Sequence, residues 1–95
     1  MPDKLSDDEI KTRLNDVPGW SVVDAKLHRD FKFANFADAL GFMVRAGIEA
    51  EKMDHHPEWF NVYNKVNVDL TTHSAGGITE LDFLLASAMN SLADM

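Results

Sequence analysis

The sequence predicts an α+β fold, a two-layer sandwich of order α-β-β-α-β-β-α with three helices on one face of a four-stranded antiparallel sheet. Four short segments show the alternation or the β-branched and aromatic residues of strands, and tight turns join them in pairs: 20–23 with 27–33, and 58–64 with 66–72. Helical periodicity occupies the segments before, between and after these pairs. The 95 residues are expected to form a single domain, 1–95.

Polar residues predict where the three helices begin. Caps are expected at Ser6, Asn35 and Thr79, while Pro18 and Pro57 mark the ends of the first two helices. The middle helix is the longest, and its apolar residues recur at three- and four-residue intervals: Phe36, Leu40, Met43, Val44, Gly47 and Ile48. Apolar helix surface that the sheet does not cover would be available for self-association.

The last predicted strand orients a histidine. Along 66–72 alternate residues share a face, and His73 continues the series that includes Thr71. The series that begins at Val66 is apolar and is expected to face the helices. We therefore expect His73 at the carboxyl end of this strand, off the face that the helices cover.

Composition excludes several classes of protein. A net charge of −7 gives the chain no electrostatic reason to bind nucleic acid directly. The absence of cysteine excludes a disulfide scaffold, a thiolate nucleophile and a thiolate metal site, and it fits a cytoplasmic location. The polar start of the chain does not resemble a secretory signal, and no apolar run is long enough to predict a membrane span.

Three of the four histidines, His55, His56 and His73, lie in one stretch of the sequence, 51–82. Pro57 favours an extended backbone at His56 while His55 is still near the helix end, so the two imidazoles are expected to diverge. These histidines could be polar residues near a helix C-terminus, where the dipole favours positive charge. They could equally perform acid–base catalysis, because imidazole both takes and gives protons near neutral pH.

Acidic and aromatic neighbours leave further alternatives. Glu51, Asp54 or Asp82 could complete a metal site, but no His-Glu-x-x-His motif is present and adjacent residues rarely converge on one ion. Asp82 lies three residues after Thr79, so a capping box alone would account for it. Trp20 suits a core position, although a flat ligand could stack on it.

The spaced set formed by Glu51, His55-His56-Pro57, Tyr63, His73 and Asp82 resembles the signature of the pterin-4a-carbinolamine dehydratases. The run DHHPEWFNVYNKV at 54–66 is similar to the core segment of that family, and the similarity extends to Gly19-Trp20, to Gly41-Phe42-Met43 and to the final helix. The resemblance implies a lyase with no cofactor and no metal. Such an enzyme converts 4a-hydroxytetrahydropterin into quinonoid dihydropterin and water during tetrahydrobiopterin recycling. It also implies a homodimer or homotetramer.

The resemblance implies roles for individual residues. His55 and His73 are expected to be the acid–base pair, with His56 orienting the pterin and Asp82 supporting or polarising a histidine. The remaining candidates for binding the pterin or lining its site are Asp54, Thr71, Thr72, Ser74, Glu51 and Trp20. Some animal relatives also bind the dimerisation helices of a transcription factor, so the alternative function is that of a helix-binding dimerisation cofactor.

Overall fold

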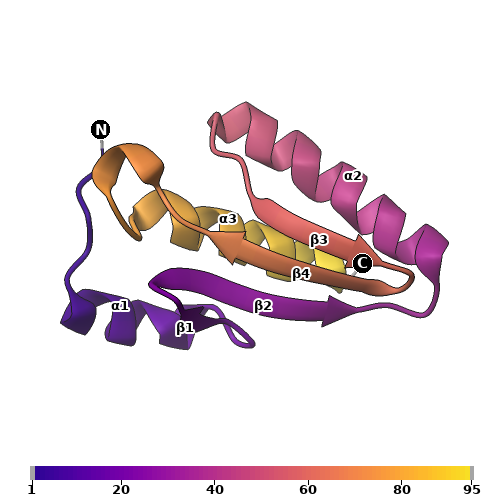
Figure 1. Cartoon of the computed structure of the whole chain (residues 1–95), viewed down its shortest axis with the longest axis horizontal. Coiled ribbons are helices and arrows are strands. Elements are labelled where there is room, and N and C mark those ends of the chain that lie inside the picture. The colour runs from indigo at the N-terminus through magenta and orange to yellow at the C-terminus, as the bar shows by residue number, and fades with distance from the viewer. Residues whose placement is uncertain (1, 95) are drawn as a thin grey trace.

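The computed structural model describes residues 2–94; Met1 and Met95, at the ends of the predicted domain, lie outside the described residues. It confirms the α+β fold and the predicted order of the elements (Figure 1). The helices and strands are α1 (Asp7–Arg13), η1 (Leu14–Asp16), β1 (Ser21–Val23), β2 (Lys26–Lys32), α2 (Phe36–Met53), β3 (Glu58–Val62), β4 (Lys65–Leu70), η2 (His73–Ala75) and α3 (Glu80–Ala93).

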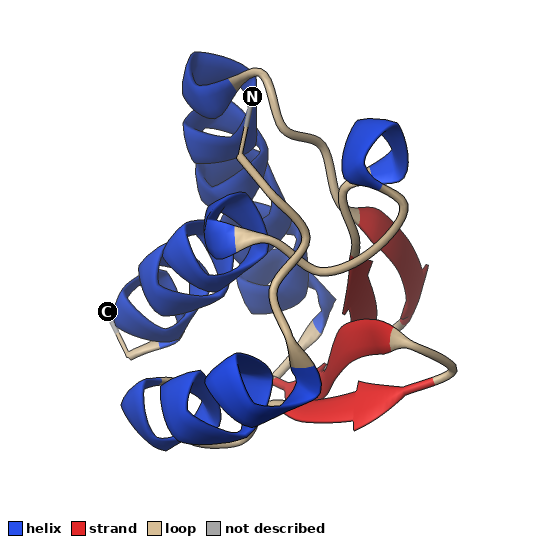
Figure 2. Ribbon diagram, turned by 90° about the vertical axis from the view of Figure 1, so that its left-hand side faces the viewer, coloured by secondary structure: helices blue, strands red, loops and turns tan. Residues whose placement is uncertain are grey.

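The four strands form one antiparallel sheet in the order β1-β2-β4-β3. Each sequential pair is a hairpin, and its turn uses left-handed backbone: Asp24 and Ala25 have φ of 51° and 64°, and Tyr63 has φ of 51°. The long helix α2 connects the hairpins, so β4 can pair with β2 at the centre of the sheet. Figure 2 shows the three α-helices gathered on one side of the sheet, with its other face uncovered.

The core lies between the sheet and the helices. Alternate residues of the two central strands face it, including Leu27 and Phe31 from β2 and Val66 and Val68 from β4. The remaining buried apolar residues come mainly from α2 and α3: Ala39, Phe42, Ala46, Ala50, Phe83, Leu85, Ala86 and Met89. The alanines let the helix backbones approach the sheet closely, so this small core is filled without large side chains on every turn.

The long helix turns much of its apolar surface outward. Four residues at four-residue intervals, Phe36, Leu40, Val44 and Ile48, are 47–55% exposed. Helical periodicity predicted the helix correctly, but it does not identify the face that packs on the sheet. We call these four residues the α2 ridge.

Three strands end one or two residues earlier than predicted, and β2 ends at Lys32 instead of residue 33 and β3 at Val62 instead of residue 64. β4 stops at Leu70 instead of residue 72, because Thr72 leaves the ladder and pairs with Gly77 in an isolated antiparallel bridge. The loop predicted for 74–77 therefore begins with the single helical turn η2, which ends at Gly76 in the left-handed region with φ of 75°. No helix within residues 2–94 combines the length and the apolar character needed to cross a bilayer.

Candidate active site

A left-handed turn at Asp54 ends α2 directly before the two adjacent histidines. Asp54 has φ of 52° and ψ of 42°; its N–H donates to the carbonyl of Glu51, and the N–H of His55 donates to the carbonyl of Ala50, both at 3.0 Å. This pair of hydrogen bonds is a Schellman motif, which usually has glycine at the left-handed position but tolerates aspartate. The predicted divergence is confirmed: His55 is 8% exposed, whereas the side chain of His56 is 57% exposed.

The inward histidine is held by a buried carboxylate. Nε2 of His55 lies 2.6 Å from Oδ1 of Asp82, which is fully buried near the start of α3. Because a carboxylate only accepts hydrogen bonds, Nε2 carries the proton and donates it, which leaves Nδ1 of the neutral ring as an acceptor. The ring is therefore fixed in both orientation and tautomer.

The same carboxylate also closes the predicted capping box. Oδ2 of Asp82 accepts from the N–H of Thr79 and from the hydroxyl of Thr72, each at 2.9 Å, and the two threonine hydroxyls lie 2.7 Å apart. Thr72 directly precedes His73, so Asp82 joins the bend after α2 to the segment that follows β4. The structure thus brings together two stretches that the sequence separates.

A second contact joins the same two stretches. Nε2 of His73 lies 3.2 Å from Oε2 of Glu58, the first residue of β3, and the side chain of His73 is 79% exposed. Nε2 of His56 lies 2.7 Å from Oε1 of Glu51. All three histidines of the predicted site therefore meet a different carboxylate at the same ring nitrogen. Sequence analysis identified two of these acids and missed Glu58.

Glu58 also has a basic partner. Nζ of Lys26, at the start of β2, donates to Oε1 of Glu58 at 2.6 Å. This hydrogen bond is the main reason that the pKa of Glu58 lies below its ordinary value and that the pKa of Lys26 lies above its own. Glu58 is therefore ionised throughout the neutral range.

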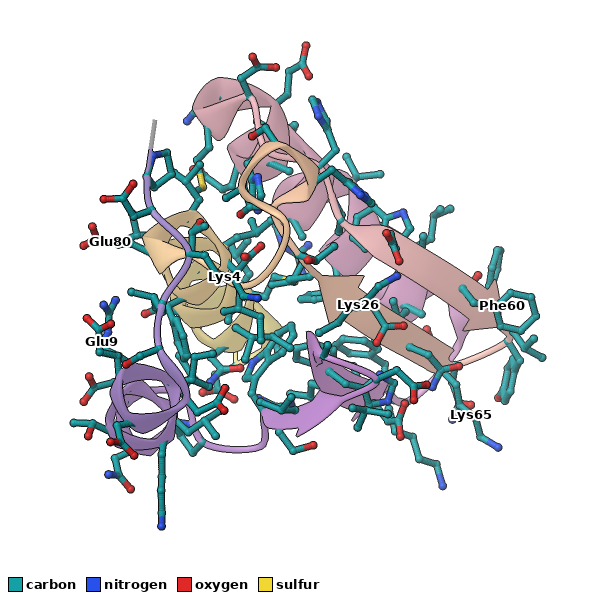
Figure 3. All side chains as sticks on the ribbon, turned by 60° about the vertical axis from the view of Figure 1, so that its left-hand side comes forward. Lys4, Glu9, Lys26, Phe60, Lys65 and Glu80 are labelled. Carbon is teal, nitrogen blue, oxygen red and sulfur yellow. The ribbon has the colours of Figure 1, made fainter. Side chains whose placement is uncertain are left out.

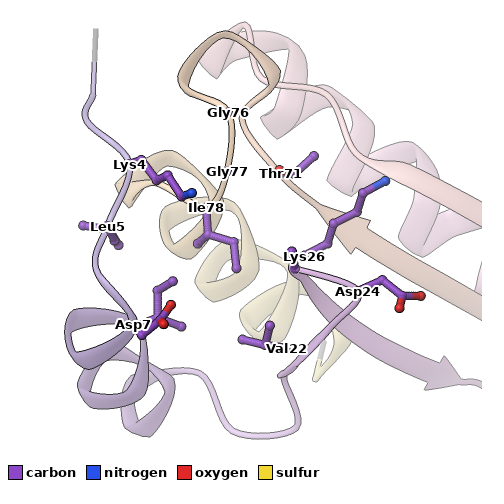
Figure 4. Close-up of a pocket in the computed structure, with 12 residues that line it drawn as sticks. Lys4, Leu5, Asp7, Val22, Asp24, Lys26, Thr71, Gly76, Gly77 and Ile78 are labelled. Carbon is purple, nitrogen blue, oxygen red and sulfur yellow. The ribbon is translucent and has the colours of Figure 1, made fainter.

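The other predicted site residues are more scattered. Trp20 is 6% exposed in the core, where it packs edge-on against Phe31 and donates its indole N–H to Oδ1 of Asn90 at 2.8 Å. Ser74 is exposed on η2. Thr71 lines a hollow of about 240 Å³ between the N-terminal segment, the β1–β2 turn and the loop that follows β4 (Figure 4). The contacts of Trp20 are thus with the core, whereas Thr71 and Ser74 adjoin the histidines in sequence.

The fourth histidine belongs to another cluster. His28 alternates with the buried Leu27 along β2 and so faces away from the core, with Nδ1 2.8 Å from Asp69 and Nε2 2.8 Å from Asp30. The hydrogen bond to Asp69 is the main cause of a raised pKa for His28. Within residues 2–94, no three histidine or acidic side chains are grouped so that they could hold a metal ion.

Comparison with known proteins identifies the family of the chain. The family model described as pterin 4 alpha carbinolamine dehydratase matches residues 3–92. A Solibacter usitatus protein whose name carries the term pterin-4-alpha-carbinolamine dehydratase is 56% identical over 93 residues, covering 98% of both chains. A Rhizobium johnstonii protein with the same term in its name is 50% identical, covering 96% of this chain and 92% of that one.

A solved structure is equally similar. The crystal structure of a Brucella melitensis protein, described as a transcriptional coactivator/pterin dehydratase, superposes with a TM-score of 0.94 at 48% identity. The match covers 96% of this chain and 99% of that one. The fold, the coverage and the sequence identity all lead to one assignment: the chain belongs to the pterin 4 alpha carbinolamine dehydratase family.

Proposed function

We propose that this chain is a hydro-lyase that converts 4a-hydroxytetrahydropterin into quinonoid dihydropterin and water, as a step in tetrahydrobiopterin recycling in the cytoplasm. The observation that carries the proposal is the grouping of three histidines, each paired with its own carboxylate, on two adjoining segments of a chain from this family. The described domain acts as a unit, and the reaction requires neither a metal nor an organic cofactor.

The reaction needs one base and one acid. A base removes the proton from ring N5, and the electron pair of that N–H bond forms the new N5=C4a double bond. The C4a–O bond breaks, and an acid gives its proton to the departing hydroxyl, which leaves as water. Histidine suits both tasks, because the neutral ring accepts a proton and the charged ring donates one near neutral pH.

His55 has the best-defined geometry for one of these tasks. Asp82 accepts the hydrogen bond from the Nε2–H of His55, so Nδ1 is the atom available to the substrate. When Nδ1 takes a proton, the adjacent carboxylate compensates the positive charge of the ring. Asp82 is therefore a supporting residue.

His73 is proposed as the second member of the acid–base pair, and His56 as the residue that orients the pterin. His56 and His73 are exposed, so a ligand can reach both rings. Asp54, Glu51, Thr71, Thr72 and Ser74 adjoin these histidines along the chain and are proposed to line the pterin. Thr72 would act by supporting the segment beside the pterin, since its hydroxyl is bonded to Asp82 and its N–H donates to the carbonyl of Gly77.

Removing the two catalytic rings tests the proposal. His55→Ala and His73→Ala should each lower the rate of dehydration of a synthetic 4a-hydroxytetrahydropterin by about 10²–10⁴-fold. The double variant should retain almost no activity above the uncatalysed background. His28→Ala is the matched control, because His28 lies in a separate cluster on the sheet. A double variant that turns over like the wild type would refute the assignment.

We also propose that the protein is a homodimer or homotetramer. The α2 ridge exposes four large apolar side chains, and the edge strand β3 exposes Phe60 and Val62; Figure 3 shows Phe60 at the periphery of the molecule. Val44→Glu, in the middle of the ridge, should shift the sedimenting species toward the 10.7 kDa monomer, whereas Lys11→Glu on α1 should not. A wild-type protein that sediments as a monomer at micromolar concentration would contradict this association.

The second candidate function is that of a helix-binding dimerisation cofactor of a transcription factor. The description of the Brucella melitensis structure favours it, and the α2 ridge is an apolar helix surface of the kind that such a partner would cover. This function would not need the histidines. Val44→Glu should therefore abolish capture of a partner helix while His55→Ala leaves that capture intact, and the opposite pattern would exclude it.

A further inference from the structure

Glu58, the carboxylate beside His73, differs from Asp82 and Glu51 because it also contacts a lysine. Glu58 uses both oxygens: Oε1 accepts from Nζ of Lys26 at 2.6 Å, and Oε2 lies 3.2 Å from Nε2 of His73. The three residues come from β2, β3 and η2, which are far apart in the sequence. A single side chain thus joins the exposed His73 to the sheet.

His73 needs such a partner more than the other histidines do. Its side chain is 79% exposed, and it stands on a single helical turn that ends at the left-handed residue Gly76. His55, in contrast, is enclosed and bonded to a buried acid. A catalytic ring that can rotate freely spends little time in the reactive geometry, and a displacement of about 1 Å can cost 10²-fold in rate.

The sheet explains why Glu58 requires Lys26. Glu58 lies directly opposite Asp69 on β4, and like charges at such positions repel one another. Lys26 reaches over β4 from the far side, and the charges of both Glu58 and Asp69 contribute to its raised pKa. Figure 4 shows the Lys26 side chain extending away from Lys4, past Thr71. The ammonium therefore offsets the repulsion that would otherwise push Glu58 away from its place beside His73.

Stability alone does not account for this arrangement. The side chains of Lys26 and Glu58 are 36% and 41% exposed, and ion pairs with that much contact with solvent contribute little to folding. What the pair does provide is a fixed position for one carboxylate oxygen. That oxygen lies 3.2 Å from Nε2 of His73, the same ring nitrogen that is hydrogen-bonded to Asp82 in His55 and to Glu51 in His56.

We propose that Glu58, held in place by Lys26, is the positioning residue for His73 in the dehydration reaction; this inference rests on the proposed function of the site. Glu58 itself touches neither the substrate nor the reacting atoms. It orders the His73 ring and directs Nδ1 toward the pterin. Lys26 acts one step further away, through Glu58.

The first experiment measures dehydration by Glu58→Gln. The turnover number should fall about 10–100-fold with little change in KM, because the ring still contacts the substrate but is poorly aligned. Lys26→Met should lower the turnover number by a smaller factor, and Lys26→Arg should restore it. The matched controls are Glu49→Gln and Lys52→Met, which break a similar surface ion pair on α2.

A double-mutant cycle separates positioning from a general structural effect. If Glu58 acts through His73, adding Glu58→Gln to His73→Ala should lower the rate no further. A full additional loss in that background would overturn the proposal. So would a Glu58→Gln single variant with the turnover number of the wild type, in a protein that His73→Ala inactivates.

A measurement without substrate distinguishes failure of this inference from failure of the proposed function. Carbon relaxation of the His73 ring by NMR should give a lower order parameter in Glu58→Gln than in the wild type, and Glu49→Gln should leave it unchanged. If the wild type does not dehydrate the pterin but the ring loosens in Glu58→Gln, the proposed function fails while the pairing stands. A ring that is equally mobile in both proteins overturns the inference, whatever the enzyme does.

Discussion

Replacing Asp82 by asparagine should shift the ring proton of His55 from Nε2 to Nδ1. Oδ2 of Asp82 accepts from the backbone N–H of Thr79, a donor that cannot reverse, and from the hydroxyl of Thr72. The single oxygen of an asparagine must therefore stay on that side, and its NH₂ group replaces Oδ1 beside His55. Nε2 of His55 must then accept a hydrogen bond, so the ring proton moves to Nδ1, the atom that the reaction needs as a base.

The expected losses of stability and of rate in Asp82→Asn follow from the hydrogen bonds that it keeps and the charge that it loses. Asp82→Asn keeps a partner for every buried donor but loses the charge, so the free energy of unfolding should fall by about 1–3 kcal/mol. For a domain of this size each kcal/mol corresponds to about 4–8 °C in Tm. The rate should fall by about 10²–10⁴-fold, because the ring remains in place as the wrong tautomer. Loss of activity should therefore far exceed loss of fold.

Three measurements on Asp82→Asn test this reasoning. Stopped-flow dehydration of 4a-hydroxytetrahydropterin gives the rate, thermal unfolding gives the stability, and two-bond proton–nitrogen NMR identifies which nitrogen of His55 is protonated. Asp94→Asn, at the exposed end of the same helix, is the control and should change none of them. Wild-type turnover with the proton still on Nε2 of His55 would refute the argument.

Two further predictions concern the pH dependence of stability and the effect of a chelator on the reaction. The pKa of His28 is raised by its hydrogen bonds to Asp69 and Asp30, so the stability that these bonds contribute is present below the unfolded pKa of 6.5 and is lost as pH rises through the higher folded value. The free energy of unfolding of His28→Gln should therefore depend less on pH above pH 6.5 than that of the wild type. Identical pH profiles for the two proteins would contradict the pairing. Dehydration should survive exhaustive treatment with a chelator, and activity that EDTA removes and zinc restores would bring back the metal site weighed for Glu51, Asp54 or Asp82.

Local signals in the sequence were sufficient for most of the fold. Caps form at Ser6, Asn35 and Thr79 as predicted, because each residue satisfies backbone donors within three positions of itself. The divergence of His55 and His56 was predictable for the same reason, since Pro57 restricts the residue before it, but the left-handed turn at Asp54 was not predicted. Such features depend on neighbours along the chain, so the sequence displays them directly.

Features that depend on register were not predictable in this way. In the sequence, Glu58 is one of many acidic residues, at the start of a predicted strand. Its contact with His73 depends on the pairing of β3 with β4 and on Lys26, which reaches across β4 from β2. The α2 ridge has the same cause: both faces of the helix are apolar, and periodicity does not show that Ala39, Phe42 and Ala46 face the core while the ridge faces outward. Asp82 shows the intermediate case, because its capping role was visible in the sequence, its support of a histidine was implied only by the family resemblance, and the structure identifies that histidine as His55.

The different burial of His55 and His73, the proposed acid–base pair, affects how each ring exchanges protons with solvent. His55 is enclosed and bonded to a buried acid, so its exchange with solvent must pass through the open ring nitrogen, Nδ1. His73 is exposed and meets only a surface carboxylate, so water can reach it directly. If the pterin covers both rings as proposed, the group that takes the proton from N5 and the group that gives a proton to the hydroxyl differ in their contact with water. We therefore expect one ring to keep its proton inside the site while the other ring equilibrates with solvent between turnovers.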